Sequence, residues 1–370
     1  MKKTKLIVKT KSKIYPIYFG NNFLNSTGKL MKRNLPDVRK ICIISDNKLP
    51  KTLLKKLIKS LKNYDLKIYK FTASEKVKSL KVANKIIEDL LKNNFNRTDC
   101  VIGCGGGVIG DLSAFISSLT KRGLKFVNIP TTLLAQVDAS IGGKTAVNTN
   151  QGKNLIGTYY QPDFVLSDVS MFKSLPQREM ISGYAEILKH SLILSRKFFF
   201  WLNKNGKKII SKKDNNFLTK AIIESCRIKN QVVSKDEKEK DLRMILNFGH
   251  TFGHAFERTK NFSNKLNHGE AVLLGMMVAS DLSSKKKLLP LKELFLIKNH
   301  YSSLKLLNNI RGVFRKKDIG KIIYYMKKDK KNINEKINLI LLNKIGKVAR
   351  PKKISLSNAE IKKFLNSYYV

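Results

Sequence analysis

Three of the five histidines in this 370-residue chain, His250, His254 and His268, lie within 19 residues of one another. His250 and His254 are four residues apart in a segment of helical pattern, so their side chains share one helix face. With Glu186 they form a constellation of imidazoles and a carboxylate. Two histidines and one carboxylate hold zinc and leave a coordination position open for a substrate oxygen. A lone histidine is more often an ordinary helix residue, but this clustering favours a metal site.

The segment around His250 differs from the zinc-protease motif H-E-x-x-H. Thr251 stands where that motif has its glutamate, which serves as the catalytic base. The sequence therefore predicts a metal centre that lacks the base of a peptidase.

A glycine-rich turn follows an apolar strand pattern that ends near residue 105. Gly105, Gly107 and Gly110 match G-x-G-x-x-G between a strand and a helix, where backbone N–H groups can bind a phosphate. Tight strand-to-helix turns also use glycine for steric reasons alone. No acidic residue ends a strand about 20 residues downstream, where a ribose contact is expected. Asp46, at the end of an upstream strand, is a candidate for that contact, although helix N-caps account for most such aspartates.

Several basic residues stand among apolar, glycine or amide neighbours, where their charge needs a local anion. They are Lys144 in GGKTAVN, Lys153 beside Asn154 in QGKNLIGT, Lys189 near Glu186, and Arg243 ahead of His250. A phosphorylated and carboxylated substrate would supply that anion.

The composition is strongly basic, with a formal net charge of +46 and a pI near 10.1. Such a charge can indicate a nucleic-acid or anionic-membrane ligand. Between residues 101 and 190, however, eight Lys or Arg face six Asp or Glu, a net of +2. The excess is mostly lysine, whereas nucleic-acid readers favour arginine with interleaved aromatics. We therefore expect a solvated lysine-rich surface and no specific nucleic-acid partner.

The four cysteines contain no C-x-x-C pair, and three lie in or beside apolar strand patterns. This predicts buried free thiols rather than a disulfide framework. There is no signal-peptide pattern and no run of about 18 apolar residues that would span a membrane. The expected location is cytoplasmic, with no membrane partner.

The first half of the chain alternates strand and helix patterns, which predicts a Rossmann-like α/β domain with a parallel sheet covered by helices on both faces. The predicted strands cover 5–10, 14–20, 40–46, 64–71, 99–105, 124–132 and 164–168, with helices at 49–62 and 77–93. Later segments, 174–195, 217–239, 244–259 and 268–287, have helical periodicity. We predict an α/β domain over 1–172 and a mainly α-helical domain over 173–370.

At this point the motifs resemble one family, 3-dehydroquinate synthase, of the sugar-phosphate cyclase superfamily. The resemblance covers residues 75–331, with each motif in the family's order and spacing. The matching segments are GGGVIGDLSAF, KRG, IPTTLLAQVDASIGGKTAVN, GKNLIGTYYQP, GYAEILKH, LNFGHTFGHAFE and HGEAV.

The resemblance implies an NAD-binding first domain, a metal- and substrate-binding second domain, and a homodimer. It places Zn²⁺, or Co²⁺ in its stead, on Glu186, His250 and His268. It places NAD on Glu75, Lys78, Gly106, Gly107, Val108, Asp111, Thr131, Thr132, Lys153 and Ser174. It places substrate on Asp138, Lys144, Asn154, Lys189, Lys229, Arg243, His254 and one of Lys330 or Lys331. Arg122 would reach the substrate phosphate across the dimer interface.

Two positions depart from the family pattern. Ala73 and Ser74 stand where Asp-Gly is usual before Glu75, and Ser174 replaces a usual threonine while keeping the hydroxyl. The first change implies a differently shaped loop beside NAD, and the second leaves the hydroxyl contact available.

The implied reaction converts 3-deoxy-D-arabino-heptulosonate 7-phosphate to 3-dehydroquinate and phosphate, with NAD used and regenerated in one turnover. His254 is the candidate for proton transfer at the substrate hydroxyls. The main alternative is another NAD- and zinc-dependent sugar-phosphate cyclase. Asn154, Arg243 and the lysines of DKK favour the carboxylated substrate. A polyol dehydrogenase is a second alternative, but its metal ligands are usually one Asp and several histidines. A nucleic-acid-binding relic of an enzyme is a third alternative, and it would not need the trio of Glu186, His250 and His268.

Overall fold

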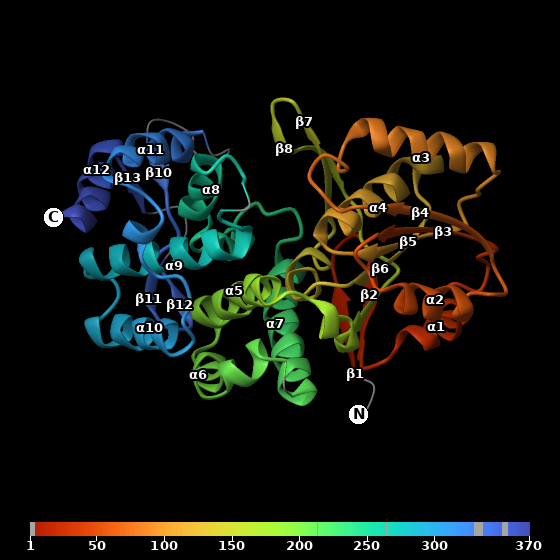
Figure 1. The fold of residues 1–370 in the computed structure, drawn as a ribbon, viewed down its shortest axis with the longest axis horizontal. Coiled ribbons are helices and arrows are strands. Elements are labelled where there is room, and N and C mark those ends of the chain that lie inside the picture. The colour runs from red at the N-terminus through yellow and green to blue at the C-terminus, as the bar shows by residue number, and fades with distance from the viewer. Residues whose placement is uncertain (1–3, 213, 264, 329–335, 350–353) are drawn as a thin grey trace. The chain divides into compact units, whose positions relative to one another are not determined.

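The computed structural model describes residues 4–212, 214–263, 265–328, 336–349 and 354–370, and the chain divides into two compact units (Figure 1). The first unit comprises Met1–Met180 and Lys212–Lys238, and the second comprises Ile181–Ser211 and Glu239–Val370. The predicted boundary at residues 172 and 173 differs from this division, because the segment 212–238 belongs to the first unit. Its helix α7 (Asn215–Lys235) contacts β1 and β2.

A seven-stranded sheet forms the centre of the first unit, in the order β1-β2-β9-β6-β5-β3-β4. The antiparallel pair β1–β2 lies at one edge, and all other neighbours pair in parallel. The predicted α/β class with a parallel sheet is confirmed, with this antiparallel edge added. The strands are β1 (Thr4–Lys9), β2 (Ile14–Gly20), β3 (Lys40–Asp46), β4 (Asp65–Phe71), β5 (Cys100–Gly105), β6 (Lys125–Pro130) and β9 (Phe164–Asp168).

Helices cover both faces of this sheet, as Figure 1 shows for α3 and α4 on one face and α1 and α2 on the other. Strands β3 and β5 are almost continuous apolar runs, as expected for strands buried on both faces. Their side chains pack with apolar residues of α3 and α4 in one core cluster. The helices are α1 (Thr27–Asn34), α2 (Lys51–Ser60), α3 (Leu80–Lys92) and α4 (Gly107–Leu119).

A two-stranded antiparallel hairpin, β7 (Lys144–Thr149) and β8 (Gly152–Tyr159), lies outside the main sheet. It packs against α4, where Thr145 Oγ1 donates a hydrogen bond to the Asp111 carbonyl and Thr158 Oγ1 to Ser118 Oγ. The hairpin is therefore hydrogen-bonded to α4 both near its start, at Asp111, and near its end, at Ser118.

The second unit is mainly helical, as predicted. Helix α5 (Gln177–Leu194) crosses the boundary between the units at Met180. The other helices are α6 (Arg196–Ile210), α8 (His250–Thr259), α9 (His268–Lys285), α10 (Leu291–Ser303), α11 (Ile319–Lys327) and α12 (Asn358–Asn366). Short strands pair as β10 (Ile337–Asn338) with β13 (Ser355–Leu356), and β11 (Leu342–Lys344) with β12 (Lys347–Val348).

All four cysteines are free and buried, as predicted. Within the described ranges, no helix combines the length and apolar character needed to cross a membrane.

A hydrogen-bonded network, buried at Tyr184 and His300, holds helix α5 against its neighbours in the second unit. Tyr184 Oη lies 3.0 Å from His300 Nε2, and His300 Nδ1 lies 3.1 Å from Asn203 Oδ1. Burial lowers the pKa of His300 to about 4, so the ring is neutral at neutral pH. A neutral ring with its proton on Nδ1 donates to the amide oxygen and accepts from the tyrosine hydroxyl. This network fixes the helix turn that precedes Glu186.

Helices α5, α8 and α9 approach one another through glycines. A Cβ added at Gly269 of α9 would lie 2.2 Å from the Ser182 Cα of α5. A Cβ at Gly275 of α9 would lie 2.2 Å from the carbonyl oxygen of Gly249, and Gly249 has a φ of 78°. Both contacts are with backbone atoms, so no side-chain rotation can relieve them. These positions require glycine.

Gly269→Ala is expected to destabilise the protein by about 1–3 kcal/mol, because the added methyl group must force two helix backbones apart. Urea unfolding of the metal-free protein measures this change. Gly320→Ala in α11 is the matched control, because nothing lies within 4 Å of an added Cβ there. The control should be neutral or slightly stabilising, since alanine is the better helix former. Equal stability of both variants would contradict the close contact.

Candidate active site

Three helices of the second unit bring Glu186, His250 and His268 together, with potential ligand atoms all within 4.8 Å of one another. His250 is the first residue of α8, placed by the left-handed turn at Gly249. His268 is the first residue of α9, where Asn267 and Glu270 form a capping box. Glu186 lies in α5 and is fully buried. Local turn chemistry thus fixes the start of both histidine-bearing helices.

The Glu186 carboxylate has an unusual environment. Neither of its oxygens has a hydrogen-bond partner in the part of the chain that the structure describes. Its nearest charged neighbour is the Lys189 ammonium, which pairs with Oε2, and His250 Nε2 lies 3.5 Å from Oε1. A buried carboxylate without hydrogen bonds is costly, and a coordinated cation would offset that cost.

This donor set fits a zinc ion. Imidazole nitrogens and a carboxylate oxygen are zinc ligands, and three protein ligands leave a fourth position open. The Nδ1 atom of His250 lies 3.3 Å from the Phe248 carbonyl oxygen, which orients the ring so that Nε2 is directed at Glu186. Cobalt accepts the same donors.

His254 lies beside this cluster. Its ring centroid is 5.3 Å from that of His250 and 6.3 Å from that of His268. His254, Glu257 and His268 form a second group whose potential ligand atoms lie within 4.8 Å of one another. The structure therefore places His254 next to the three predicted ligands, as its candidate role in proton transfer requires.

Two further predicted residues of the second unit are buried cations. Lys189 is one turn of α5 beyond Glu186, and Arg243 lies in a short helical segment, Leu242–Asn247, ahead of α8. Lys330 and Lys331, the lysines of DKK, lie outside the described residues.

In the first unit, the predicted glycine turn joins β5 to the N-terminus of α4. Gly106 is the N-cap residue and no side chain caps the helix. A Cβ at Gly105 would lie 2.6 Å from the Ile109 Cβ, and one at Gly106 would lie 3.2 Å from Thr132 Cγ2. The first backbone N–H groups of the helix therefore donate no hydrogen bond to a capping side chain. Free N–H groups at a helix N-terminus are the arrangement that binds a phosphate. Gly107 and Val108 form the first turn of α4.

A polar network surrounds this helix start. Lys78 Nζ pairs with the Asp111 carboxylate of α4 and donates to Asn154 Oδ1 at 2.6 Å. Glu75 accepts from Lys153 Nζ at 3.0 Å and from Asn148 Nδ2 at 2.6 Å. Five of the residues predicted from the resemblance are thus joined across α4, hairpin β7–β8 and the loop ahead of α3.

The two carboxylates of this network differ in acidity. Burial raises the pKa of Asp111 above its usual value, although the Lys78 ammonium favours the ionised form. Burial also raises the pKa of Glu75, but the hydrogen bond from Asn148 and the charge of Lys153 outweigh it, so its pKa lies below the usual value. Glu75 therefore stays ionised and paired with Lys153 at neutral pH.

Another ion pair in this unit joins Asp138 to Lys229. Lys229 Nζ of α7 donates to Asp138 Oδ1 at 2.6 Å and to the Asp138 carbonyl at 2.5 Å. Asp138 belongs to a π-helical turn, Ala135–Ala139, that follows strand β6. Through this pair, the buried ammonium of Lys229 joins α7 to the rest of the first unit.

The remaining predicted residues lie at the edges of these groups. Thr131 N donates to the Gly105 carbonyl, and Lys144 is exposed at the start of β7. Asp46 does not cap α2, because the N-cap residue of that helix is Pro50. The Asp46 carboxylate instead accepts a hydrogen bond from the backbone N–H of Lys48 at 3.0 Å. Ser174 is exposed and belongs to none of the groups described above.

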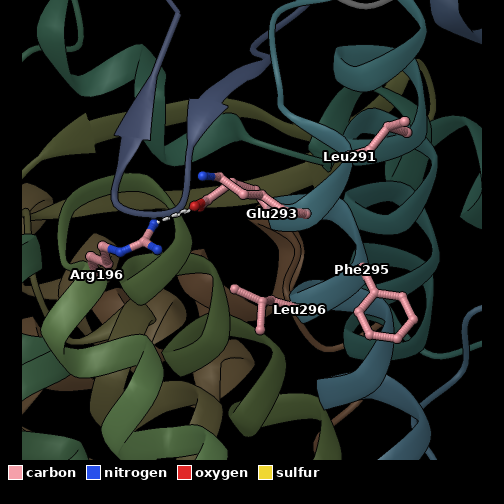
Figure 2. A pocket seen from close by; sticks show the side chains of 6 residues that line it. Arg196, Leu291, Glu293, Phe295 and Leu296 are labelled. Atoms are coloured by element: carbon pink, nitrogen blue, oxygen red, sulfur yellow. Dashed lines mark hydrogen bonds and ion pairs between the residues drawn. The ribbon is translucent and has the colours of Figure 1, made fainter.

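Figure 2 shows an open groove of about 580 Å³ in the second unit that contains no predicted site residue. It is lined by Leu291, Phe295, Leu296 and a charge pair in which Arg196 Nη1 lies 2.6 Å from Glu293 Oε2. This groove therefore does not mark the chemical site of the protein.

The sequence analysis did not single out Asn148 or Glu257. Asn148 binds Glu75 through its amide nitrogen and accepts from Asn154 N at 3.0 Å through its oxygen. Glu257 Oε2 lies 3.1 Å from His268 Nδ1. The signal for Glu257 was present, because residues 250, 254 and 257 share one helix face.

The comparisons with known proteins agree with these features. Residues 68–182 match the 3-dehydroquinate synthase N-terminal family and residues 183–332 match the C-terminal family. A 3-dehydroquinate synthase from Pelagibacter ubique is 54% identical over 342 residues, covering 92% of this chain and 93% of that protein. One from Dictyoglomus thermophilum is 41% identical over 343 residues, covering 93% of each.

A solved structure shares the fold over nearly the whole chain. It is 2-deoxy-scyllo-inosose synthase complexed with carbaglucose-6-phosphate, NAD+ and Co2+, with a TM-score of 0.86 and 26% identity. The match covers 98% of this chain and 100% of that chain. With both family models matching in succession and relatives above 40% identity, this chain belongs to the 3-dehydroquinate synthase family of enzymes.

Proposed function

We propose that this enzyme converts 3-deoxy-D-arabino-heptulosonate 7-phosphate to 3-dehydroquinate and inorganic phosphate, a step of aromatic amino acid biosynthesis. The observation that carries the proposal is the cluster of the buried Glu186 with the partly buried His250 and His268 in a member of this family. The first domain, with the glycine turn and the Glu75–Lys78 network, would bind NAD. The second would bind the metal and contribute to substrate binding.

The cofactors follow from the donor sets. When bound, Zn²⁺ acts as a Lewis acid toward substrate hydroxyls, and NAD accepts and returns a hydride. The similar 2-deoxy-scyllo-inosose synthase structure contains NAD+ and Co2+. In this chain, the uncapped N-terminus of α4 fits a pyrophosphate. The buried Glu186 carboxylate, which pairs with Lys189 but accepts no hydrogen bond from the described residues, fits a cation.

The chain's own residues bind charge and move protons. His254, beside the metal ligands, would transfer a proton at a substrate hydroxyl. Lys189 and Arg243 are buried cations that would bind the substrate's anionic groups, with Lys144, Asn154 and one lysine of DKK. Once Glu186 binds a cation, Lys189 is left beside a positive centre, which favours an anionic ligand there.

Lys229 would contact the substrate from the first domain together with Asp138. Their ion pair provides the buried Lys229 ammonium with a carboxylate partner. We also propose a cytoplasmic location, because four free buried thiols are typical of proteins from a reducing compartment.

Phosphate release tests the function directly. Purified enzyme should release phosphate from the heptulosonate phosphate only when both Zn²⁺ and NAD are present, without net accumulation of NADH. Chelation should abolish the release and added Zn²⁺ should restore it. Release from other sugar phosphates, with none from this substrate, would instead favour a sister cyclase. Steady production of NADH would favour a dehydrogenase.

A homodimer is part of the proposal, and one corner of the first unit supports it. Large apolar side chains are exposed at the end of α4 and on β8, namely Leu119, Leu155, Ile156 and Tyr159. Arg122, three residues after Leu119, is exposed in left-handed backbone with a φ of 64°. Non-glycine residues adopt this conformation at a cost, and such strain clusters at functional positions. A second protomer covering this corner would bring Arg122 to its substrate phosphate.

Mixed dimers test whether Arg122 acts across the interface. Arg122→Ala and Lys189→Ala should each lower kcat/KM by about a hundredfold, because each removes a charged substrate contact worth about 3 kcal/mol. Co-expression of the two variants should restore about a quarter of wild-type activity, since half of the random dimers hold one complete site.

Two differently tagged chains allow the mixed dimer to be purified and assayed alone. Co-expression of two Lys189→Ala chains is the control and should stay inactive. If Arg122 acts within its own protomer, every site of the mixed dimer lacks one residue and activity stays at the level of the single variants. That result, or a monomer by sedimentation, would contradict the dimer proposal.

A further inference from the structure

Glu257 contacts one of the predicted metal ligands from behind. It lies in α8, two helical turns after His250, and its side chain is 12% exposed. Its Oε2 atom is 3.1 Å from His268 Nδ1, which belongs to the first turn of α9. The sequence resemblance assigns no role to this glutamate.

This contact decides which nitrogen of His268 can bind a metal. A neutral imidazole carries one proton, and the nitrogen without it holds the lone pair. A carboxylate only accepts hydrogen bonds, so Nδ1 must carry the proton and donate it to Glu257. The lone pair then lies on Nε2. His250 follows the same rule, with Nδ1 directed at the Phe248 carbonyl and Nε2 toward Glu186.

We propose that Glu257 is a positioning residue for the metal centre, which holds His268 in the tautomer and orientation that present Nε2 to the ion. The inference rests on the metal site of the proposed function. A carboxylate behind a ligating histidine also raises the basicity of the ligand. In the corresponding position, His250 Nδ1 faces the Phe248 backbone carbonyl at 3.3 Å.

The close helix packing explains why Glu257 can play this role. Gly253, one turn before Glu257, would carry a Cβ 3.1 Å from the Ala271 carbonyl of α9. Because α8 and α9 lie this close together, the Glu257 side chain of α8 reaches the first turn of α9. Glu257 therefore links the two histidine-bearing helices directly.

Zn²⁺ affinity of the holoenzyme and its variants tests the proposal, measured by competition with a chromogenic chelator. Glu257→Ala should bind Zn²⁺ about 10- to 100-fold more weakly than wild type. Glu257→Gln should recover part of this loss, because the amide oxygen can accept the same hydrogen bond without the charge. The visible absorption bands of the Co²⁺-loaded protein should shift in Glu257→Ala, since the geometry of one ligand changes.

Glu293→Gln is the matched control for loss of a buried carboxylate in the same unit. Glu293 is 5% exposed and accepts hydrogen bonds from Arg196 and from Ile345 N. Neither of these partners belongs to the histidine cluster. This variant should lower stability in urea and leave Zn²⁺ affinity unchanged. Unfolding of each metal-free variant separates loss of affinity from loss of fold.

Three outcomes would overturn the inference. Zn²⁺ affinity in Glu257→Ala within about twofold of wild type would show that His268 needs no support. Complete loss of binding in both Glu257 variants, as in His250→Ala, would make Glu257 a ligand with His254 and His268. Wild-type protein that binds no Zn²⁺, or a His250→Ala variant that binds normally, would remove the metal site itself and thereby the proposed function.

Discussion

Close backbone contact between helices α5, α8 and α9 is the constraint on which the site depends. Gly269 lies against Ser182 and Gly275 lies against Gly249, both too close for any side chain larger than hydrogen. This close packing brings Glu186, in the middle of α5, near His250 and His268, the first residues of α8 and α9, so that the three side chains can share one ion. These glycines therefore allow three helix segments of the second unit to approach closely enough for their side chains to coordinate one ion.

The electrostatics of the cluster follow from that geometry. Helix packing buries Glu186 completely, where neither oxygen finds a hydrogen-bond partner among the described residues. The Lys189 ammonium offsets part of the charge, and the imidazoles are its other polar neighbours. Such an arrangement is strained as a structural core, because an unsolvated carboxylate is expensive. It is well suited to a dication and an anionic substrate, which together satisfy both the carboxylate and the lysine.

Much of this architecture could be predicted from the sequence. Short apolar runs bounded by turn residues, such as those that form β3 and β5, are typical of strands buried on both faces. The predicted α/β class, its parallel sheet and the glycine turn at 105–107 are confirmed. The spacing of three histidines indicated a metal site, and the resemblance to the family implied Glu186, His250 and His268 as its ligands. The structure brings these three side chains together. The hairpin β7–β8 was not predicted, because its half-exposed, glycine-interrupted strands lack a clear alternation.

Other features depend on contacts between distant segments, which local patterns do not encode. The helical pattern predicted over 244–259 is interrupted, because Gly249 turns left-handed against Met276 and α8 begins only at His250. Periodicity predicts that α7 is a helix but does not indicate which unit it packs against. Its packing against β1 and β2 of the first unit was therefore not predicted. The hydrogen bond between Glu257 and His268 joins two helices and needed the structure.

X-ray absorption at the zinc edge of the loaded enzyme tests the central claim most directly, because it counts the ligand atoms. We expect one zinc ion per chain, with a first shell of nitrogen and oxygen and the multiple-scattering signal of two imidazoles. His250→Ala should reduce that signal to one imidazole. A shell without imidazole scattering, or one that the His250 substitution leaves unchanged, would contradict a metal centre built by α5, α8 and α9.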